Sequence, residues 1–241
     1  MNTLRYMLAV AALLLTAAVG HAQDHSYPDF SVVPGASRPG ATAEEVCAQG
    51  FTTKSIRPPA SATNVLKRAL FAQMQAAGDV PPDVTIGDYE LDHCEALTNG
   101  GDPGLVRDAS GKVDVQASIT LGNLRMQPRV TFFEKERERA GSPWYGLDQP
   151  YPAAEMKDVI EVKVHKMMCA GQLTMREAQV LSCQAWQYTY GCLVMGVQAA
   201  CDSMQAAKAS ADYTEARPTP APDSAASRAD AGSAVPLLGT K

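Results

Sequence analysis

Several common functional signatures are missing from this 241-residue chain. It has no Gly-x-Ser-x-Gly nucleophile elbow, no phosphate-binding glycine loop and no dinucleotide fingerprint, so nothing indicates the enzyme classes that depend on them. No Cys-x-x-Cys pair is present, and a structural zinc knuckle is therefore not expected. The longest apolar run is shorter than the roughly 18 residues that a transmembrane helix needs.

Basic charge is also scarce, because the chain has a formal net charge of −5. Nucleic-acid-binding proteins usually show a basic excess. The composition therefore argues against a large phosphate-binding surface, although it leaves room for a local basic groove.

The N-terminus has the features of a secretory signal peptide. Arg5 precedes an apolar run that extends to Val19, and Gly20-His21-Ala22 supplies small residues around a cleavage site after Ala22. No cysteine follows this site closely, so a lipid anchor is not expected. Loss of residues 1–22 removes one base and no acid, which leaves 20 basic against 26 acidic residues and a net charge of −6. We expect a periplasmic or secreted protein without a stable membrane anchor.

All six cysteines lie after the predicted cleavage site. An even number of cysteines in an exported chain predicts disulfides, up to three here, in an oxidising compartment. Six cysteines allow about 15 pairings, and the sequence does not choose among them.

The mature chain divides into a leader, one folded domain and a tail. Residues 23–43 are rich in proline and glycine and predict an extended, loosely held leader. The domain spans 44–202, and the Ala/Ser/Pro-rich residues 203–241 predict a disordered tail. Within the domain we expect a short strand between Cys47 and Arg57, and helices over 61–77, over 153–170 and from Thr174 onward. The last two helices form an antiparallel hairpin because their connection is short.

The segment Asp88–Cys94 carries the candidate chemistry. Tyr89 and Leu91 alternate with Glu90 and Asp92, which predicts a half-buried strand that ends just before an Asn-Gly-Gly turn. Asp92 and His93 at its end offer a carboxylate for a hard cation and a base that titrates near neutral pH. Neighbouring strand residues point to opposite faces, so the two converge only if the strand bends. The alternative is a surface ion pair or a turn histidine.

The order of short motifs along residues 47–188 resembles a family. The motifs are Cys47-x-x-Gly-Phe-Thr, Arg57-Pro58-Pro59, Thr63-Asn64-x-Leu66-Lys67, Tyr89 to His93 with Gly100-Gly101, Asn123-Leu124 with Gln127-Pro128, Lys157-Asp158-x-x-Glu161, His165, Cys169-Ala170-Gly171, Ala178-Gln179 and Trp186. Together they are similar to exported bacterial proteins with an HNH-like motif, usually named HNH endonucleases. The resemblance implies an α+β fold with a ββα-metal (HNH-like) finger, an N-terminal helix and a C-terminal helical hairpin.

The resemblance also implies an activity and its residues. The activity is metal-dependent hydrolysis of DNA, or RNA, with low sequence specificity and one divalent ion, Mg²⁺ or Mn²⁺. Asp92 resembles the metal ligand on the strand, and His93 resembles the general base. Asn123 resembles the middle residue that orients the base or helps to hold the metal; Asn99 is a second candidate.

The helix ligand of the family has no direct counterpart. Ala153 and Ala154 stand at its expected positions, and neither binds metal. Glu155 is the nearest substitute. Glu161 and His165, four residues apart on one helix face, offer another pair, with helix ion pairs to Lys157 or Lys166 as the alternative.

Three cations are candidates for phosphate contacts: Arg125, Arg129 and Lys157. The alternative is that they are ordinary surface cations. The rival to the nuclease is a catalytically inactive, disulfide-stabilised binding module that keeps the HNH-like fold. If the protein is a toxin, an immunity protein is an expected partner.

Overall fold

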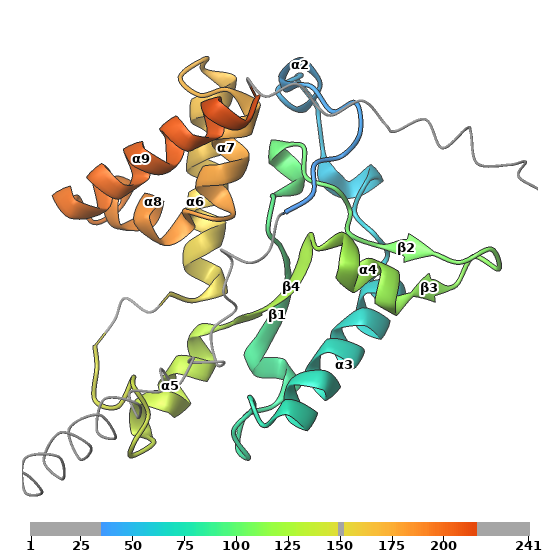
Figure 1. Ribbon diagram of the computed structural model, residues 1–241, viewed down its shortest axis with the longest axis vertical. Helices are drawn as coiled ribbons and strands as arrows, with labels where there is room; N and C mark the ends of the chain where they lie inside the picture. The colour runs from blue at the N-terminus through green and yellow to red at the C-terminus, as the bar shows by residue number, and fades with distance from the viewer. Residues whose placement is uncertain (1–34, 149–151, 216–241) are drawn as a thin grey trace, which may run out of the picture.

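The structure of the protein is a computed structural model that describes residues 35–148 and 152–215. It is a mixed α+β fold with two small antiparallel sheets. Figure 1 shows the helices α6 to α9 on one side of the central strand pair and α3 and α4 on the other. The predicted signal peptide lies outside the described residues. No helix in these two ranges is long and apolar enough to cross a membrane.

The central strand pair consists of β1 (Tyr89–His93) and β4 (Leu124–Pro128). They run antiparallel, with Tyr89 opposite Pro128 and His93 opposite Leu124. The strand predicted from the alternation around Leu91 is therefore confirmed. A second, two-residue pair, β2 (Val106–Arg107) and β3 (Val113–Asp114), forms an arm between β1 and β4 in the sequence.

An aromatic cluster anchors the beginning of β1. The buried ring of Tyr89 lies between Phe71 and Phe132, with ring centroids 6.0 and 5.3 Å away, and Phe133 and Trp144 extend the series. These rings come from α3 (Ala60–Ala77), from α5 (Val130–Glu138) and from the loop after it. Stacked and edge-on rings add packing energy to the area that they bury.

A helical cluster anchors the end of β1. It is built from α6 (Ala154–Cys169), α7 (Met175–Ser182), α8 (Trp186–Leu193) and α9 (Gln198–Glu215). Ile160, Val164, Leu181 and Trp186 are buried in it. The predicted helix over 153–170 and its antiparallel partner are present, and Thr174 forms the expected capping box with Glu177 at the start of α7.

The start of the domain is helical rather than extended. Instead of a strand between Cys47 and Arg57, the chain forms α2 (Ala43–Val46) and the 3₁₀ turn η2 (Thr53–Ser55). Thr42 and Thr52 accept hydrogen bonds from the backbone of these turns and so cap them. Local capping therefore outweighed the weak strand pattern.

The end of the predicted leader is held by the domain. The Arg38 amide donates to the Gly100 carbonyl, the Asp102 amide donates to the Ala36 carbonyl, and Ser37 bridges to Gly101. Gly101 is required here because a Cβ atom at this position would lie 1.9 Å from the Glu95 carbonyl oxygen. Residues 36–38 are thus bound to the turn that follows β1, whereas the sequence predicted a loosely held leader.

The predicted disordered tail begins too early. Residues 203–215 belong to α9, in which Met204 and Ala211 are buried against the neighbouring helices. The small alanines of this segment gave little apolar signal in the sequence, yet they allow α9 to pack closely on α7 and α8. The remainder of the predicted tail lies outside the described residues.

All six cysteines are paired, as expected. The bridges are Cys47–Cys169, Cys94–Cys183 and Cys192–Cys201. They tie α2 to α6, the end of β1 to α7, and α8 to α9. Three disulfides indicate an oxidising environment.

Candidate functional site

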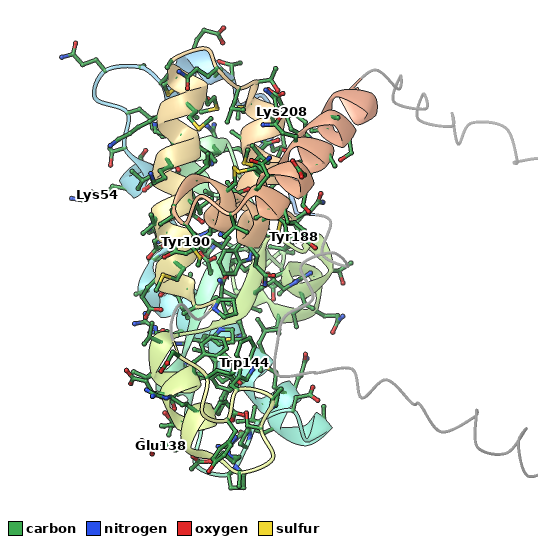
Figure 2. The ribbon with its side chains drawn as sticks, turned by 90° about the vertical axis from the view of Figure 1, so that its left-hand side faces the viewer. Lys54, Glu138, Trp144, Tyr188, Tyr190 and Lys208 are labelled. Carbon is green, nitrogen blue, oxygen red and sulfur yellow. A yellow bond between two sulfur atoms is a disulfide. The ribbon has the colours of Figure 1, made fainter. Side chains whose placement is uncertain are left out.

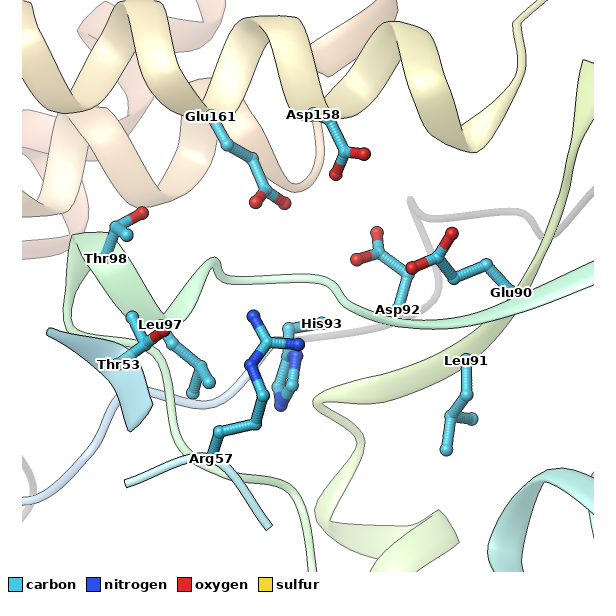
Figure 3. A pocket seen from close by; sticks show the side chains of 10 residues that line it. All are labelled: Thr53, Arg57, Glu90, Leu91, Asp92, His93, Leu97, Thr98, Asp158 and Glu161. Atoms are coloured by element: carbon cyan, nitrogen blue, oxygen red, sulfur yellow. The ribbon is translucent and has the colours of Figure 1, made fainter. Parts of the chain in front are cut away.

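A polar pocket lies where the end of β1 faces α6. It is lined by ten residues: Thr53, Arg57, Glu90, Leu91, Asp92, His93, Leu97, Thr98, Asp158 and Glu161. Its volume is about 80 Å³, equal to a few water molecules at about 30 Å³ each. Figure 3 shows carboxylates from β1 and α6 on one side, with His93 and Arg57 on the other.

The strand places Asp92 and His93 on opposite faces. Figure 3 shows the Asp92 carboxylate on the α6 side and the His93 ring on the side of Arg57, as the alternation of a strand dictates. Both residues nevertheless line the same pocket. The pocket thus extends around the end of the strand.

Lys157 is the centre of the α6 side. Its side chain is 0% exposed, and its ammonium lies 2.8 Å from Asp92 Oδ2 and donates to Glu161 and to the backbone carbonyl of His93. Burial alone would lower the pKa of Lys157, but the carboxylates of Asp92 and Glu161 outweigh it and raise the pKa. The lysine is therefore a fixed positive charge that joins α6 to the end of β1.

The imidazole of His93 is neutral at physiological pH. Burial lowers its pKa to about 4, against the raising effect of Asp92. Its Nε2 lies 3.3 Å from the Pro103 carbonyl oxygen, and in a neutral ring this nitrogen must carry the proton that it donates there. Nδ1 then holds a free lone pair, which is what a general base requires.

The acidic side of the pocket gathers four carboxylates, those of Glu90, Asp92, Asp158 and Glu161. Desolvation raises the pKa of Glu90, Asp158 and Glu161, and neighbouring carboxylates add to the increase. Lys157 and the Arg129 guanidinium, which pairs with Glu90 at 2.8 Å, face this group, and Lys67 and Arg57 add positive charge near Glu90 and His93. Burial raises the pKa of Glu161 to about 7, so this carboxylate is readily protonated.

The pocket contains the type of ligand atom that a hard cation such as Mg²⁺ prefers. Hard cations prefer carboxylate oxygens, but Asp92 Oδ2 is already paired with the Lys157 ammonium at 2.8 Å. In the arrangement described for 35–148 and 152–215, Lys157 separates the carboxylates, and no three His, Cys, Asp or Glu side chains converge closely enough to hold a metal.

The side chain of Asn123 forms hydrogen bonds with backbone groups and does not line the pocket. Its fully buried side chain donates to the carbonyls of Glu95 and Asp102 and accepts from the amides of Glu95 and Ala36. These contacts hold the loop after β1 against the start of β4. Asn99, the second candidate, is likewise buried, and its amide donates to Ser182 Oγ.

Two of the predicted helix ligands lie apart from the pocket lining. Glu155 accepts a hydrogen bond from the Val130 amide and so caps α5. His165 lies beside Cys169, with Nε2 3.7 Å from Sγ. Glu161 does line the pocket. The predicted pair of Glu161 and His165 is therefore divided, with Glu161 in the pocket and His165 one turn further along α6, beside Cys169.

The three predicted phosphate contacts also differ from expectation. Lys157 is fully buried and bound to oxygens, so it has no face for a phosphate. Arg125 donates to the carbonyls of Ile119 and Leu124. Arg129 is half-exposed and paired with Glu90. None of the three lines the pocket.

Sequence reasoning missed Arg57, Thr53, Thr98 and Asp158 as pocket residues. A signal existed for Asp158, because its i, i+3 spacing from Glu161 places both on one face of a helix. None existed for the other three, since they reach the pocket only through the folding of η2 (Thr53–Ser55) and of η4 (Leu97–Asn99) around the strand end.

Comparison of the chain with family models, curated proteins and solved structures gives no match.

Proposed function

We propose that this protein is a metal-dependent endonuclease that hydrolyses phosphodiester bonds, with the pocket at the end of β1 as its active site. The observation that carries the proposal is His93: its imidazole lines the same pocket as the carboxylates of Asp92, Asp158 and Glu161, and its Nε2 lies 3.3 Å from the Pro103 carbonyl oxygen. In this proposal the neutral ring of His93 accepts a proton from water; its pKa of about 4 makes it a weaker base than an unperturbed imidazole, so a divalent ion would have to make the water more acidic.

A divalent ion, Mg²⁺ or Mn²⁺, would be held by Asp92 with Asp158 or Glu161. These carboxylates line one pocket and are oxygen donors of the kind that hard cations prefer, which supports this assignment. Such an ion polarises a scissile phosphate and stabilises the leaving oxygen. In this proposal β1, β4 and α6 play the part of the ββα finger of HNH nucleases.

Low sequence specificity follows from the size of the site. A pocket of about 80 Å³ accommodates a backbone phosphate and its attacking water more readily than a base. Contacts to phosphate position a nucleic acid but carry no sequence information. We therefore expect cutting of DNA, or RNA, at many sites, in the periplasm or outside the cell; a toxin of this kind would need an immunity protein.

One observation favours the inactive binding module as the second candidate. The Lys157 ammonium already lies between Asp92 and Glu161, where it supplies positive charge without a metal. A site of this design keeps its structure whether or not it catalyses.

A plasmid assay tests the proposal. Purified protein is incubated with supercoiled plasmid and Mg²⁺ or Mn²⁺, with EDTA as the metal-free control. We expect nicking that EDTA abolishes and that His93→Gln lowers by about 10²- to 10⁴-fold, the usual contribution of a general base.

His165→Gln is the matched control, because His165 is on α6 outside the pocket lining. It should cut as the wild type does. Circular dichroism confirms that both variants fold. Intact plasmid with every divalent ion, or equal cutting by wild type and His93→Gln, would replace the nuclease by the binding module.

A further inference from the structure

Three residues of the pocket carry hydrogen-bond donors that the protein itself does not use, and we call them the donor wall: Arg57, Thr53 and Thr98. In Figure 3 the Arg57 guanidinium lies across the pocket from the carboxylates. Within residues 35–148 and 152–215, none of these three side chains forms an intramolecular hydrogen bond or ion pair. Every neighbouring carboxylate, by contrast, faces a lysine, an arginine or another acid.

The backbone fixes Arg57 in this position. Its amide donates to the Thr53 carbonyl at 2.7 Å, which closes the turn after η2, and Pro58 and Pro59 follow at once and restrict the chain. Figure 3 shows the guanidinium extending upward beside the His93 imidazole. The positive charge of Arg57 contributes to the lowered pKa of His93, which agrees with this proximity.

The charge of these residues favours an anionic ligand. Arg57 is the one cationic side chain among the ten lining residues, and its planar guanidinium matches two oxygens of a phosphate. A carboxylate ligand would fit the guanidinium equally, but the two threonine hydroxyls supply donors for the further oxygens that a tetrahedral phosphate has.

We propose that Arg57, with the hydroxyls of Thr53 and Thr98, forms the phosphate-binding site of the pocket, directly beside His93. This inference rests on the proposed function for its purpose: it holds the phosphodiester between the donor wall and the carboxylates, with the free Nδ1 of His93 next to it. Because the donors contact only phosphate oxygens, the site recognises the backbone common to all nucleic acids.

The test uses inorganic phosphate as the probe and calorimetry as the readout. The wild type, Arg57→Met and Lys54→Met are titrated with phosphate in the presence of Mg²⁺. Lys54 is the matched control: it is an exposed cation three residues away, and Figure 2 shows it extending from the edge of the molecule. Both variants lose one charge from the same segment.

We expect Arg57→Met to weaken phosphate binding by at least about tenfold, since a hydrogen bond to a charged group contributes about 1.5–3 kcal/mol. Lys54→Met should bind phosphate as the wild type does. Arg57→Lys should bind it with intermediate affinity, because lysine keeps the positive charge but cannot donate two parallel hydrogen bonds as a guanidinium does. Equal binding by Arg57→Met and Lys54→Met, or no phosphate binding by the wild type, would overturn the inference.

A second arm separates this inference from the proposed function. Mn²⁺ binding should not weaken in Arg57→Met, because the cation belongs to the carboxylate side and loss of a nearby positive charge favours a cation. In the plasmid assay, Arg57→Met should lower kcat/KM by about 10²- to 10³-fold, as expected for loss of a donor to a developing charge. Phosphate binding that requires Arg57 in a protein that cuts no plasmid would retain the anion site and reject the nuclease.

Discussion

At the scale of single residues, the buried charged side chains allow the clearest predictions about stability. Lys157 is fully buried, and its ammonium contacts Asp92, Glu161 and the carbonyl of His93. Taking such ions out of water is costly unless they are paired. The lysine and the two carboxylates are thus interdependent, and removal of one leaves the others uncompensated.

Lys157→Met should destabilise the protein by about 3–5 kcal/mol, the usual cost of breaking a buried ion pair from one side. Urea unfolding at pH 7 measures the change in unfolding free energy. Lys163→Met, which removes an exposed lysine of the same helix, should change it by less than about 0.5 kcal/mol. Adding Glu161→Gln to Lys157→Met should recover part of the loss; no recovery would contradict the electrostatic explanation.

Asp88 gives the fold a defined acid sensitivity. Burial would raise its pKa, but hydrogen bonds from Lys135 and from the Thr85 amide and hydroxyl lower it to about 2. Because the folded-state pKa lies below the unfolded value near 3.8, the stabilisation is present above pH 4 and is lost as pH falls from about 4 to 2.

Asp88→Asn should therefore lower the unfolding free energy at pH 7 by about 2 kcal/mol, from a shift of nearly two units at 1.36 kcal/mol each. The difference from the wild type should shrink toward zero near pH 2. Thermal unfolding of both proteins between pH 2 and 7 measures this difference in stability. Asp148→Asn, at a highly exposed ion pair, is the control. A difference that is independent of pH would contradict the assignment.

At the scale of elements, β1 connects two hydrophobic clusters. Its first residue, Tyr89, is buried in the aromatic cluster, and Cys94, directly after its last residue, is bridged to α7 in the helical cluster. The pocket lies at the junction, so the geometry of the site depends on both clusters at once.

The disulfides should differ in what their removal costs. Cys94–Cys183 has a sequence separation of 89 and Cys192–Cys201 one of 9. Chain-entropy arguments give about 4–5 kcal/mol for the long loop and about 2–3 kcal/mol for the short one. Urea unfolding of the Cys94→Ala/Cys183→Ala and Cys192→Ala/Cys201→Ala variants should show this order; the reverse order would contradict it.

The sequence predicted elements with strong local signals and missed those set by tertiary contacts. The alternation around Leu91, the apolar spacing along α6 and the capping box at Thr174 each identified an element correctly. The helix at 203–215 and the binding of residues 36–38 to the Gly100 turn had no local signal, because partners far away in the chain create them. The same limit hid Arg57, which no periodicity connects to His93.

At the scale of the whole molecule, the net charge of −5 disfavours the binding of a polyanion such as a nucleic acid. The proposed activity therefore depends on local attraction, by a bound cation and by Arg57, more than on long-range steering. Three disulfides fit a chain that folds in an oxidising environment.

Cys94 directly follows His93 in the chain, and its sulfur is bonded to α7. A newly synthesised chain in a reducing cytosol has two thiols at this point, so the backbone beside the imidazole has no covalent attachment to the helices. Under the proposed function, activity would then depend on an oxidant, because the Cys94–Cys183 bond fixes the backbone beside His93 to α7.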